Sequence, residues 1–234
     1  RLVEWMLMKN PAERVETMTI IHQALSEIER GTNDRLVIPK VAPSGTKIVK
    51  RMGSLPKLFA DGAFHDRDQQ QAIITNAILD GKSLIGVYGR GGIGKTALAC
   101  KVLSDFELRG VMDGVAYLRA DSTLALNIST LWDKLAEFLP KDHSFHQLKH
   151  DTATSTPDKT RALLAGLVGG RFLVYIDNLE TLQNIDDYAL SNPDMRQFFE
   201  ALLAAQGSPF TVIITSRYPI PFPNTLNPYA MLLR

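Results

Sequence analysis

The sequence predicts an α/β fold in which a parallel β-sheet carries helices on both faces. Apolar runs at residues 84–88, 171–177 and 210–215 have the length and composition of buried strands. Segments with helical spacing of apolar residues separate these runs, so that strands and helices alternate along the chain. Strands that are connected through helices are expected to run parallel and to be covered on both sides.

The elements of this sheet domain are expected to follow one another at short intervals. Residues 124–139 give the clearest helix, because Ile128, Leu131, Leu135 and Phe138 fall on one face. The next helix is expected to start at Thr156-Pro157-Asp158, with a capping threonine and an acid beside the N-terminus, after a polar loop at 140–155. The remaining expected helices cover residues 69–79, 97–106 and 194–205, and the remaining strand covers residues 114–118.

Two segments precede the sheet domain. Residues 1–30 are expected to form two helices around a break at Asn10-Pro11. Residues 31–61 scatter proline and glycine among lysine and arginine, which predicts a mostly extended basic linker. The sheet domain then covers residues 62–234. Because the chain starts without methionine and its last residues have the pattern of a strand, we expect a fragment whose final domain is truncated at the C-terminus.

Composition and charge narrow the range of partners. The 234 residues are 45% hydrophobic and 22% charged, with a formal net charge of +1. A nucleic-acid partner is not indicated, because phosphate-binding surfaces normally carry a basic excess. One cysteine, Cys100, makes no intrachain disulfide and suits a reducing cytoplasm. No apolar run reaches the roughly 18 residues of a membrane span. We therefore expect a cytoplasmic protein without a membrane partner.

The most informative motif is the glycine-rich run at residues 89–96, which fits G-x-x-x-x-G-K-[ST] at every fixed position. A predicted strand precedes it and a predicted helix follows, as a phosphate-binding loop requires, whereas a glycine-rich hairpin before an unrelated helix is the alternative. We expect Lys95 to reach the β- and γ-phosphates of a nucleoside triphosphate and Thr96 to contact Mg²⁺. The residues expected to bind the nucleotide are Gly89, Arg90, Gly91, Gly92, Ile93, Gly94, Lys95, Thr96 and Ala97.

An aspartate ends the apolar run at residues 173–176. The carboxyl ends of parallel strands face the ligand, so Asp177 is expected to be the second Mg²⁺ ligand, with a turn-forming role as the alternative. Asn178 follows it and cannot accept a proton. Glu180 is the nearest acid and the candidate catalytic base, unless it is a solvated carboxylate on the turn. We therefore expect slow ATP hydrolysis.

An arginine follows the strand at residues 210–215. Arg217 could form a bidentate contact with the γ-phosphate, or it could be an exposed arginine at the end of the sheet. Three histidines at 143, 146 and 150 could in principle bind zinc, but they fall in the polar loop, and a solvated loop is favoured.

In their order and spacing, the P-loop, the Leu-Val-Tyr-Ile-Asp-Asn-Leu-Glu run and the Ile-Ile-Thr-Ser-Arg run resemble the NB-ARC and NACHT branches of the STAND NTPases. The resemblance covers residues 62–234 and implies ATP or ADP with Mg²⁺ as cofactors. It also implies that Arg217 is the sensor that distinguishes ATP from ADP. Asn178 departs from the paired aspartates of many NB-ARC proteins, while the spacing from Asp177 to Glu180 is similar to that of NACHT proteins.

Two further stretches show weaker resemblances. Residues 64–68 resemble a degenerate form of the family's entry motif, with Asp66 in place of the usual glycine, which implies that His65 and Arg67 contact adenine. Residues 7–14 resemble the last conserved segment of a protein kinase domain, although Val15 replaces the usual proline. A helical hairpin with a proline turn is the alternative for that segment.

Together these features predict an ATP/ADP-dependent switch domain of a STAND-type signalling or defence protein. By the resemblance, the full-length protein is expected to associate with itself when ATP is bound. Two alternatives stay open at the level of the sequence. One is a continuously cycling AAA+-like ATPase, which an acid directly after Asp177 would favour. The other is a regulatory NTPase module of a multidomain protein kinase.

Overall fold

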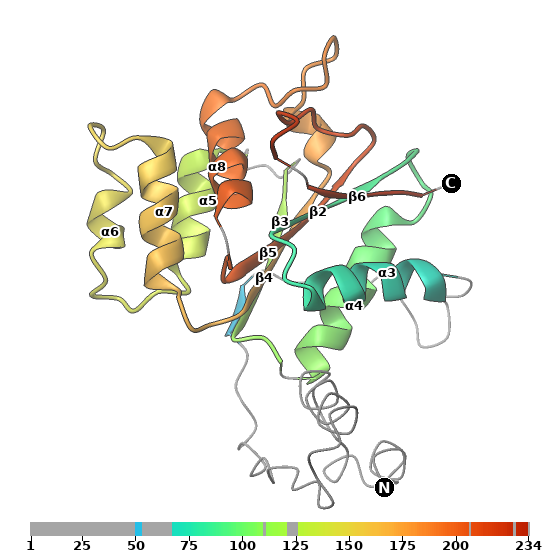
Figure 1. Ribbon diagram of the computed structural model, residues 1–234, viewed down its shortest axis with the longest axis horizontal. Helices are drawn as coiled ribbons and strands as arrows, with labels where there is room; N and C mark the ends of the chain where they lie inside the picture. The colour runs from blue at the N-terminus through green and yellow to red at the C-terminus, as the bar shows by residue number, and fades with distance from the viewer. Residues whose placement is uncertain are drawn as a thin grey trace, which may run out of the picture. The chain divides into compact units, whose positions relative to one another are not determined.

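Six parallel strands form the central sheet of the computed structural model (Figure 1). The structure describes residues 50–52, 67–109, 111–120, 126–205, 207–226 and 228–233, which all lie in one compact unit, Ile48–Arg234. The segments expected to form N-terminal helices, with the kinase-like segment, most of the expected linker, and His65 lie outside the described residues.

The strand order is β1-β3-β4-β5-β2-β6, and every neighbouring pair is parallel. This confirms the predicted α/β fold with a parallel sheet. Strand β5 lies between β2 and β4, so the carboxyl ends of these three strands meet at one edge. The strands are β1 (Lys50–Met52), β2 (Leu84–Tyr88), β3 (Gly114–Arg119), β4 (Phe172–Asp177), β5 (Phe210–Ser216) and β6 (Tyr229–Leu232).

Edge strand β1 differs from the sequence prediction, whereas edge strand β6 agrees with the strand pattern expected for the last residues. Strand β1 pairs with β3 inside the segment that the sequence assigned to a linker. Three residues are too few to show a periodic pattern, and the surrounding prolines and glycines dominated the prediction. Strand β6 pairs with β2 along its whole length, from Ile85↔Tyr229 to Tyr88↔Leu232.

Helices cover both faces of the sheet (Figure 1). Helices α3 (Asp68–Leu79) and α4 (Lys95–Arg109) lie against the face that carries Ile85, Leu173 and Tyr175. Helices α5 (Ile128–Ala136), α7 (Thr156–Gly166) and α8 (Pro193–Ala204) cover the face that carries Val174 and Ile176. Alternate strand residues thus enter different cores, which explains why these strands are apolar on both faces.

Local signals set the helix ends, with three corrections to the prediction. Asn127 caps α5 through a capping box with Thr130, so α5 begins later than the expected residue 124. It also ends at Ala136, before the expected residue 139. Ser155, not Thr156, caps α7, because its hydroxyl accepts the Asp158 N–H while the Thr156 hydroxyl donates to Asp194. The expected loop at 140–155 contains a short helix, α6 (Phe145–Leu148), anchored by the buried Phe145. No helix in the described ranges is long and apolar enough to cross a membrane.

Candidate functional site

The loop between β2 and α4 depends on glycine at defined points. Gly92 and Gly94 have φ angles of 77° and 95°, in the left-handed region that side chains disfavour. At Gly89 an added Cβ would lie 2.8 Å from the carbonyl oxygen of Leu233. Because α4 starts at Lys95, its unpaired N–H groups lie at the end of this loop. The predicted strand, glycine loop and helix are all present.

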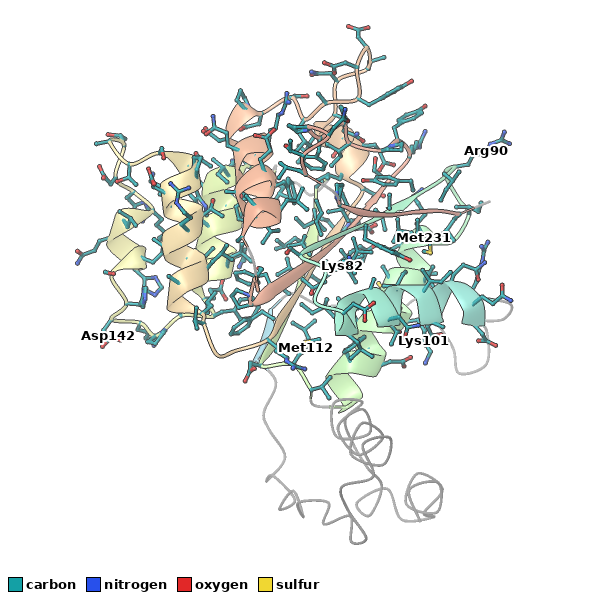
Figure 2. The ribbon with its side chains drawn as sticks, viewed as in Figure 1. Lys82, Arg90, Lys101, Met112, Asp142 and Met231 are labelled. Atoms are coloured by element: carbon teal, nitrogen blue, oxygen red, sulfur yellow. The ribbon has the colours of Figure 1, made fainter. Side chains whose placement is uncertain are left out.

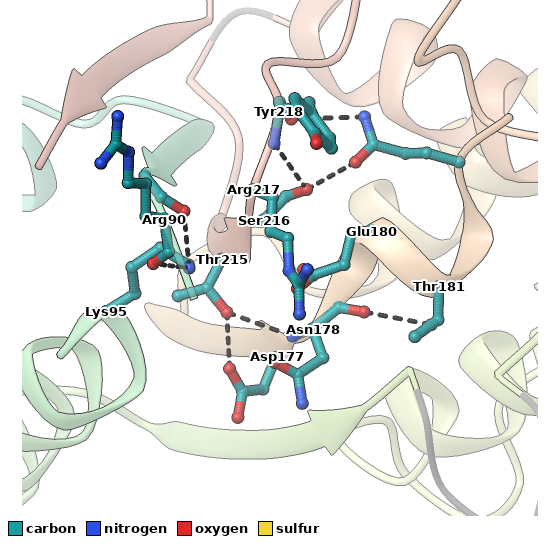
Figure 3. A network of polar contacts seen from close by, with 12 residues as sticks. Arg90, Lys95, Asp177, Asn178, Glu180, Thr181, Thr215, Ser216, Arg217 and Tyr218 are labelled. Atoms are coloured by element: carbon teal, nitrogen blue, oxygen red, sulfur yellow. Dashed lines mark hydrogen bonds and ion pairs between the residues drawn. The ribbon is translucent and has the colours of Figure 1, made fainter. Parts of the chain in front are cut away.

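Lys95 crosses the inside of the loop. Its side chain is buried, and its Nζ donates to the carbonyl oxygens of Gly89 at 2.8 Å and Arg90 at 3.1 Å (Figure 3). A buried ammonium needs such partners, and the carbonyl dipoles supply them without a counter-charge. The Arg90 side chain, in contrast, is exposed and points away from the ribbon (Figure 2). Lys95 is therefore the cation that the loop holds inside itself.

Asp177 is 3% exposed and receives hydrogen bonds from four hydroxyl groups. Its Oδ1 accepts from Thr96 at 2.9 Å, from Tyr175 at 2.6 Å and from Thr215 at 2.5 Å, while its Oδ2 accepts from Tyr117 at 3.4 Å. Burial and the charge of Asp177 raise the pKa of both tyrosines well above the ordinary value, so both remain donors.

The pairing of Thr96 with Asp177 fits a magnesium site. A hydroxyl and a carboxylate are hard oxygen ligands of the kind that Mg²⁺ prefers, and α4 and β4 bring them to 2.9 Å of each other. Thr96 and Asp177 would hold the ion. The structure thus brings together the two side chains that the sequence predicted as metal ligands.

Glu180 and Arg217 face each other across the carboxyl ends of β4 and β5 (Figure 3). The Arg217 Nε lies 3.3 Å from the Glu180 Oε1, with side-chain exposures of 58% and 19%. The Glu180 Oε2 is buried and has no hydrogen-bond partner in the described part of the chain. Glu180 is therefore not the freely solvated carboxylate of the alternative interpretation.

The turn after β4 brings Glu180 to this position. Asn178 adopts the left-handed conformation, with φ 60° and ψ 42°, and its N–H donates to the Thr215 hydroxyl at 3.2 Å. The chain then enters the short 3₁₀ helix η2 (Leu179–Leu182). Asparagine tolerates this conformation better than most residues, which explains its place at the turn.

Two hollows adjoin at Gly91 and Arg217. The smaller has a volume of about 330 Å³ and is lined by Gly91, Gly92, Gly94, Lys95, Thr96, Ala97, Asn178, Glu180 and Arg217. The larger has a volume of about 640 Å³ and is lined by Gly89, Arg90, Gly91, Ile93, Arg217, Tyr218, Leu232 and Leu233. The first carries charged and hydroxyl groups, whereas apolar side chains contribute much of the second.

Arg67 contacts the P-loop from the start of α3. Its Nη2 donates to the carbonyl oxygen of Ile93 at 3.2 Å, so it holds the loop backbone in this structure. Its predicted contact with adenine stays a prediction. The histidines of the 140–155 segment have local roles: His143 Nδ1 accepts the Phe145 N–H, and the His146 ring lies 2.9 Å from the Pro140 carbonyl oxygen.

Sequence reasoning missed three hydroxyl groups of the site. Tyr117, Tyr175 and Thr215 were interpreted only as strand residues, because aromatic and β-branched side chains are typical of strands. The available signal was the spacing: Tyr175 precedes Asp177 by two residues and therefore lies on the same face of β4.

Comparison with known proteins adds to this geometry. The family model of the NB-ARC domain matches residues 67–215. No curated protein sequence matches the chain. Among solved structures, the Drosophila ORC bound to DNA shares 23% identity over 73% of this chain and 42% of that chain, with a TM-score of 0.48. The Aeropyrum pernix ORC2 protein shares 17% identity over 70% of this chain and 44% of that chain, with a TM-score of 0.45.

A Walker-type ATPase of Pyrococcus abyssi shares 14% identity over 65% of this chain and 45% of that chain, with a TM-score of 0.40. The chain thus spans less than half the length of each of these three proteins. The NB-ARC match covers more than half of the chain and contains the P-loop, Asp177 and the strand before Arg217. The chain therefore belongs to the NB-ARC family of nucleotide-binding P-loop NTPase domains.

Proposed function

We propose that this chain is an ATP/ADP-dependent switch domain of a signalling or defence protein, with slow ATP hydrolysis. The observation that carries the proposal is the ion pair between Glu180 and Arg217, two residues that line the smaller hollow. An arginine paired with a carboxylate can exchange that partner for a γ-phosphate. The same proposal includes self-association of the full-length protein in its ATP state.

The phosphates would occupy the smaller hollow. Lys95, the N–H groups at the start of α4 and the glycine backbone all line it or lie at its wall. Mg²⁺ bound by Thr96 and Asp177 would neutralise phosphate charge. The base and sugar would occupy the larger hollow, where Ile93, Leu232 and Leu233 provide apolar contact surface.

Interaction energies favour replacement of Glu180 by a γ-phosphate as the partner of Arg217 when ATP is bound, but not when ADP is bound. A partly exposed ion pair contributes about 0.2–1 kcal/mol, whereas a charge-assisted hydrogen bond to a phosphate contributes about 1.5–3 kcal/mol. A γ-phosphate within reach of Arg217 would therefore outcompete Glu180. ADP lacks that group, so the ion pair would persist, and the two nucleotide states would differ at this point of the site.

Slow hydrolysis follows from the same contact. Glu180 is the acid that lines the smaller hollow, but one of its oxygens is paired with Arg217. Asn178, the residue next to Asp177, cannot accept a proton. Asp177 itself accepts hydrogen bonds from Thr96, Tyr175 and Thr215 and in this proposal holds the metal ion. Glu180 would become available to orient water only after Arg217 has moved to the γ-phosphate.

The test is a pair of affinities, for ATP and for ADP in Mg²⁺, measured by calorimetry on the wild type and on Arg217→Ala. We expect the variant to lose roughly tenfold or more of its preference for ATP over ADP, since the contact it removes exists only with ATP. Arg171→Ala is the matched control, because Arg171 is an exposed arginine at the opposite end of β4. Equal losses for both nucleotides would contradict the sensor role of Arg217.

A further inference from the structure

The carboxylate of Asp177 is held by hydroxyl groups alone. It is 3% exposed, and in the described part of the chain no lysine or arginine donates to it. A buried carboxylate without a cationic partner needs several donors, and here they are distributed unequally. Three hydroxyls donate to Oδ1 at 2.5–2.9 Å, and one donates to Oδ2 at the longer distance of 3.4 Å. This inequality fixes the rotation of the carboxylate.

Two of the three Oδ1 donors come from the sheet itself. Tyr175 is fully buried, and its ring packs against that of Tyr117, with centroids 5.4 Å apart. Thr215 is also fully buried, and its hydroxyl accepts the Asn178 N–H at 3.2 Å while it donates to Asp177. Both hydroxyls are thus held by their own surroundings. The third donor, Thr96, lines the smaller hollow and belongs to the predicted metal site.

We infer that Tyr175 is a positioning residue for the magnesium site, which it serves by fixing, together with Thr215, the orientation of the Asp177 carboxylate beside Thr96. This inference rests on the proposed function, because it assumes that nucleotide binds with Mg²⁺. The hydroxyl of Tyr175 acts through Asp177 and does not itself touch the ligand. Outer contacts of this kind orient a metal ligand, and their loss typically weakens metal affinity by about 10–100-fold.

Phenylalanine fills the same volume as tyrosine, so Tyr175→Phe removes the hydroxyl and leaves the core intact. The matched control is Tyr117→Phe, which removes a hydroxyl from the same carboxylate at the longer distance, from the neighbouring strand. The measurement is the affinity for ADP by calorimetry, first in excess chelator and then over a series of Mg²⁺ concentrations.

We expect Tyr175→Phe to bind ADP with wild-type affinity in the absence of Mg²⁺. We expect it to need an Mg²⁺ concentration about tenfold or more above that of the wild type to reach half of the change in ADP affinity that saturating Mg²⁺ produces. We expect Tyr117→Phe to need at most about twice the wild-type concentration, because a 3.4 Å contact is a weak hydrogen bond. A merely structural role would lower the melting temperature equally with and without Mg²⁺ and would leave the Mg²⁺ requirement unchanged. That result, or equal shifts in both variants, would overturn the inference.

A second pair of variants tests the inference if Tyr175→Phe does not fold. Thr215→Val removes the other sheet donor to Oδ1, and Thr215→Ser keeps the hydroxyl. We expect the valine variant to need about tenfold or more Mg²⁺ and the serine variant to resemble the wild type. An unchanged valine variant would overturn the inference. A wild type that binds no nucleotide would contradict the proposed function first, and the two failures are therefore distinguishable.

Discussion

The two halves of the candidate nucleotide site are held together in different ways. In the first half, Lys95 and Asp177 are 7% and 3% exposed, and hydrogen bonds of 2.5–3.1 Å hold them to the loop carbonyls and to Thr96, Tyr175 and Thr215. In the second half, one ion pair of 3.3 Å joins Glu180 to Arg217, whose side chain is 58% exposed. The first half is preorganised, and the second is exchangeable.

This difference has a physical cause with functional consequences. Buried polar groups are costly to leave unpaired, so hydrogen bonds within the protein hold the first half in place. An exposed ion pair is weakened by solvent and salt, so its partners can change at little cost. Changes in the first half should therefore remove binding, while changes in the second should alter the preference for one nucleotide or the rate of hydrolysis.

Lys95→Ala is the strongest test of the buried half. Removal of the only charge held inside the loop should weaken binding of both ATP and ADP by about 100-fold or more, because charge-assisted contacts to the phosphates are lost. Lys101→Ala is the matched control: Lys101, labelled in Figure 2, lies on the same helix, is more exposed than Lys95, and forms an ion pair with Asp105. Calorimetry gives both affinities. Unchanged binding in Lys95→Ala would mean that the loop does not hold phosphate.

Glu180→Gln tests the exchangeable half. We expect hydrolysis to slow by about tenfold or more, because the shape stays while the proton acceptor is lost. We also expect ATP affinity to rise by up to about fivefold, since Arg217 no longer has a charged partner to leave, while ADP affinity stays constant. Phosphate release under single turnover and calorimetry provide the two readouts.

The control for this variant is Glu200→Gln, which removes a similar glutamate–arginine ion pair, with Arg196 on α8. It should change neither the rate nor the affinities. If Glu180→Gln hydrolyses ATP as fast as the wild type, Glu180 has no role in activating water.

The preorganised half was the more predictable from sequence, but only in part. A strand, a glycine loop and a helix are local signals, so the P-loop and the acid that ends β4 were visible in consecutive residues. The hydroxyls of Tyr117, Tyr175 and Thr215 were not, because each donor comes from a strand whose residues look apolar or β-branched. Tyr117 and Thr215 meet Asp177 because β3 and β5 flank β4, and strand order is not a local property. Tyr175 could have been found from its spacing of two residues from Asp177 on the same strand.

The exchangeable half shows the same limit more strongly. Glu180 and Arg217 were each singled out by position, but nothing in the sequence indicated that they pair with each other. Their contact needs β5 beside β4 and the left-handed turn at Asn178, which together bring two strand ends into register. The edge strand β1 was missed for a related reason, since its three residues are recognisable only through their pairing with β3.

Cys100 gives the smallest and most specific test of the buried half. Its thiol lies in α4 near Asp177, and burial together with the charge of Asp177 raises its pKa from 9.0 to about 12. A raised pKa in the folded state contributes stability that is complete below pH 9 and is lost as pH rises toward 12, because the unfolded thiol ionises first. Between pH 8 and pH 9.5 we therefore expect the free energy of unfolding to fall by less than about 1 kcal/mol through ionisation of this thiol.

Thermal unfolding at the two pH values measures this fall in the free energy of unfolding, and the fall should be smaller in Cys100→Ala than in the wild type. Identical pH dependence in both proteins would mean that the buried half is more accessible to water than this structure indicates.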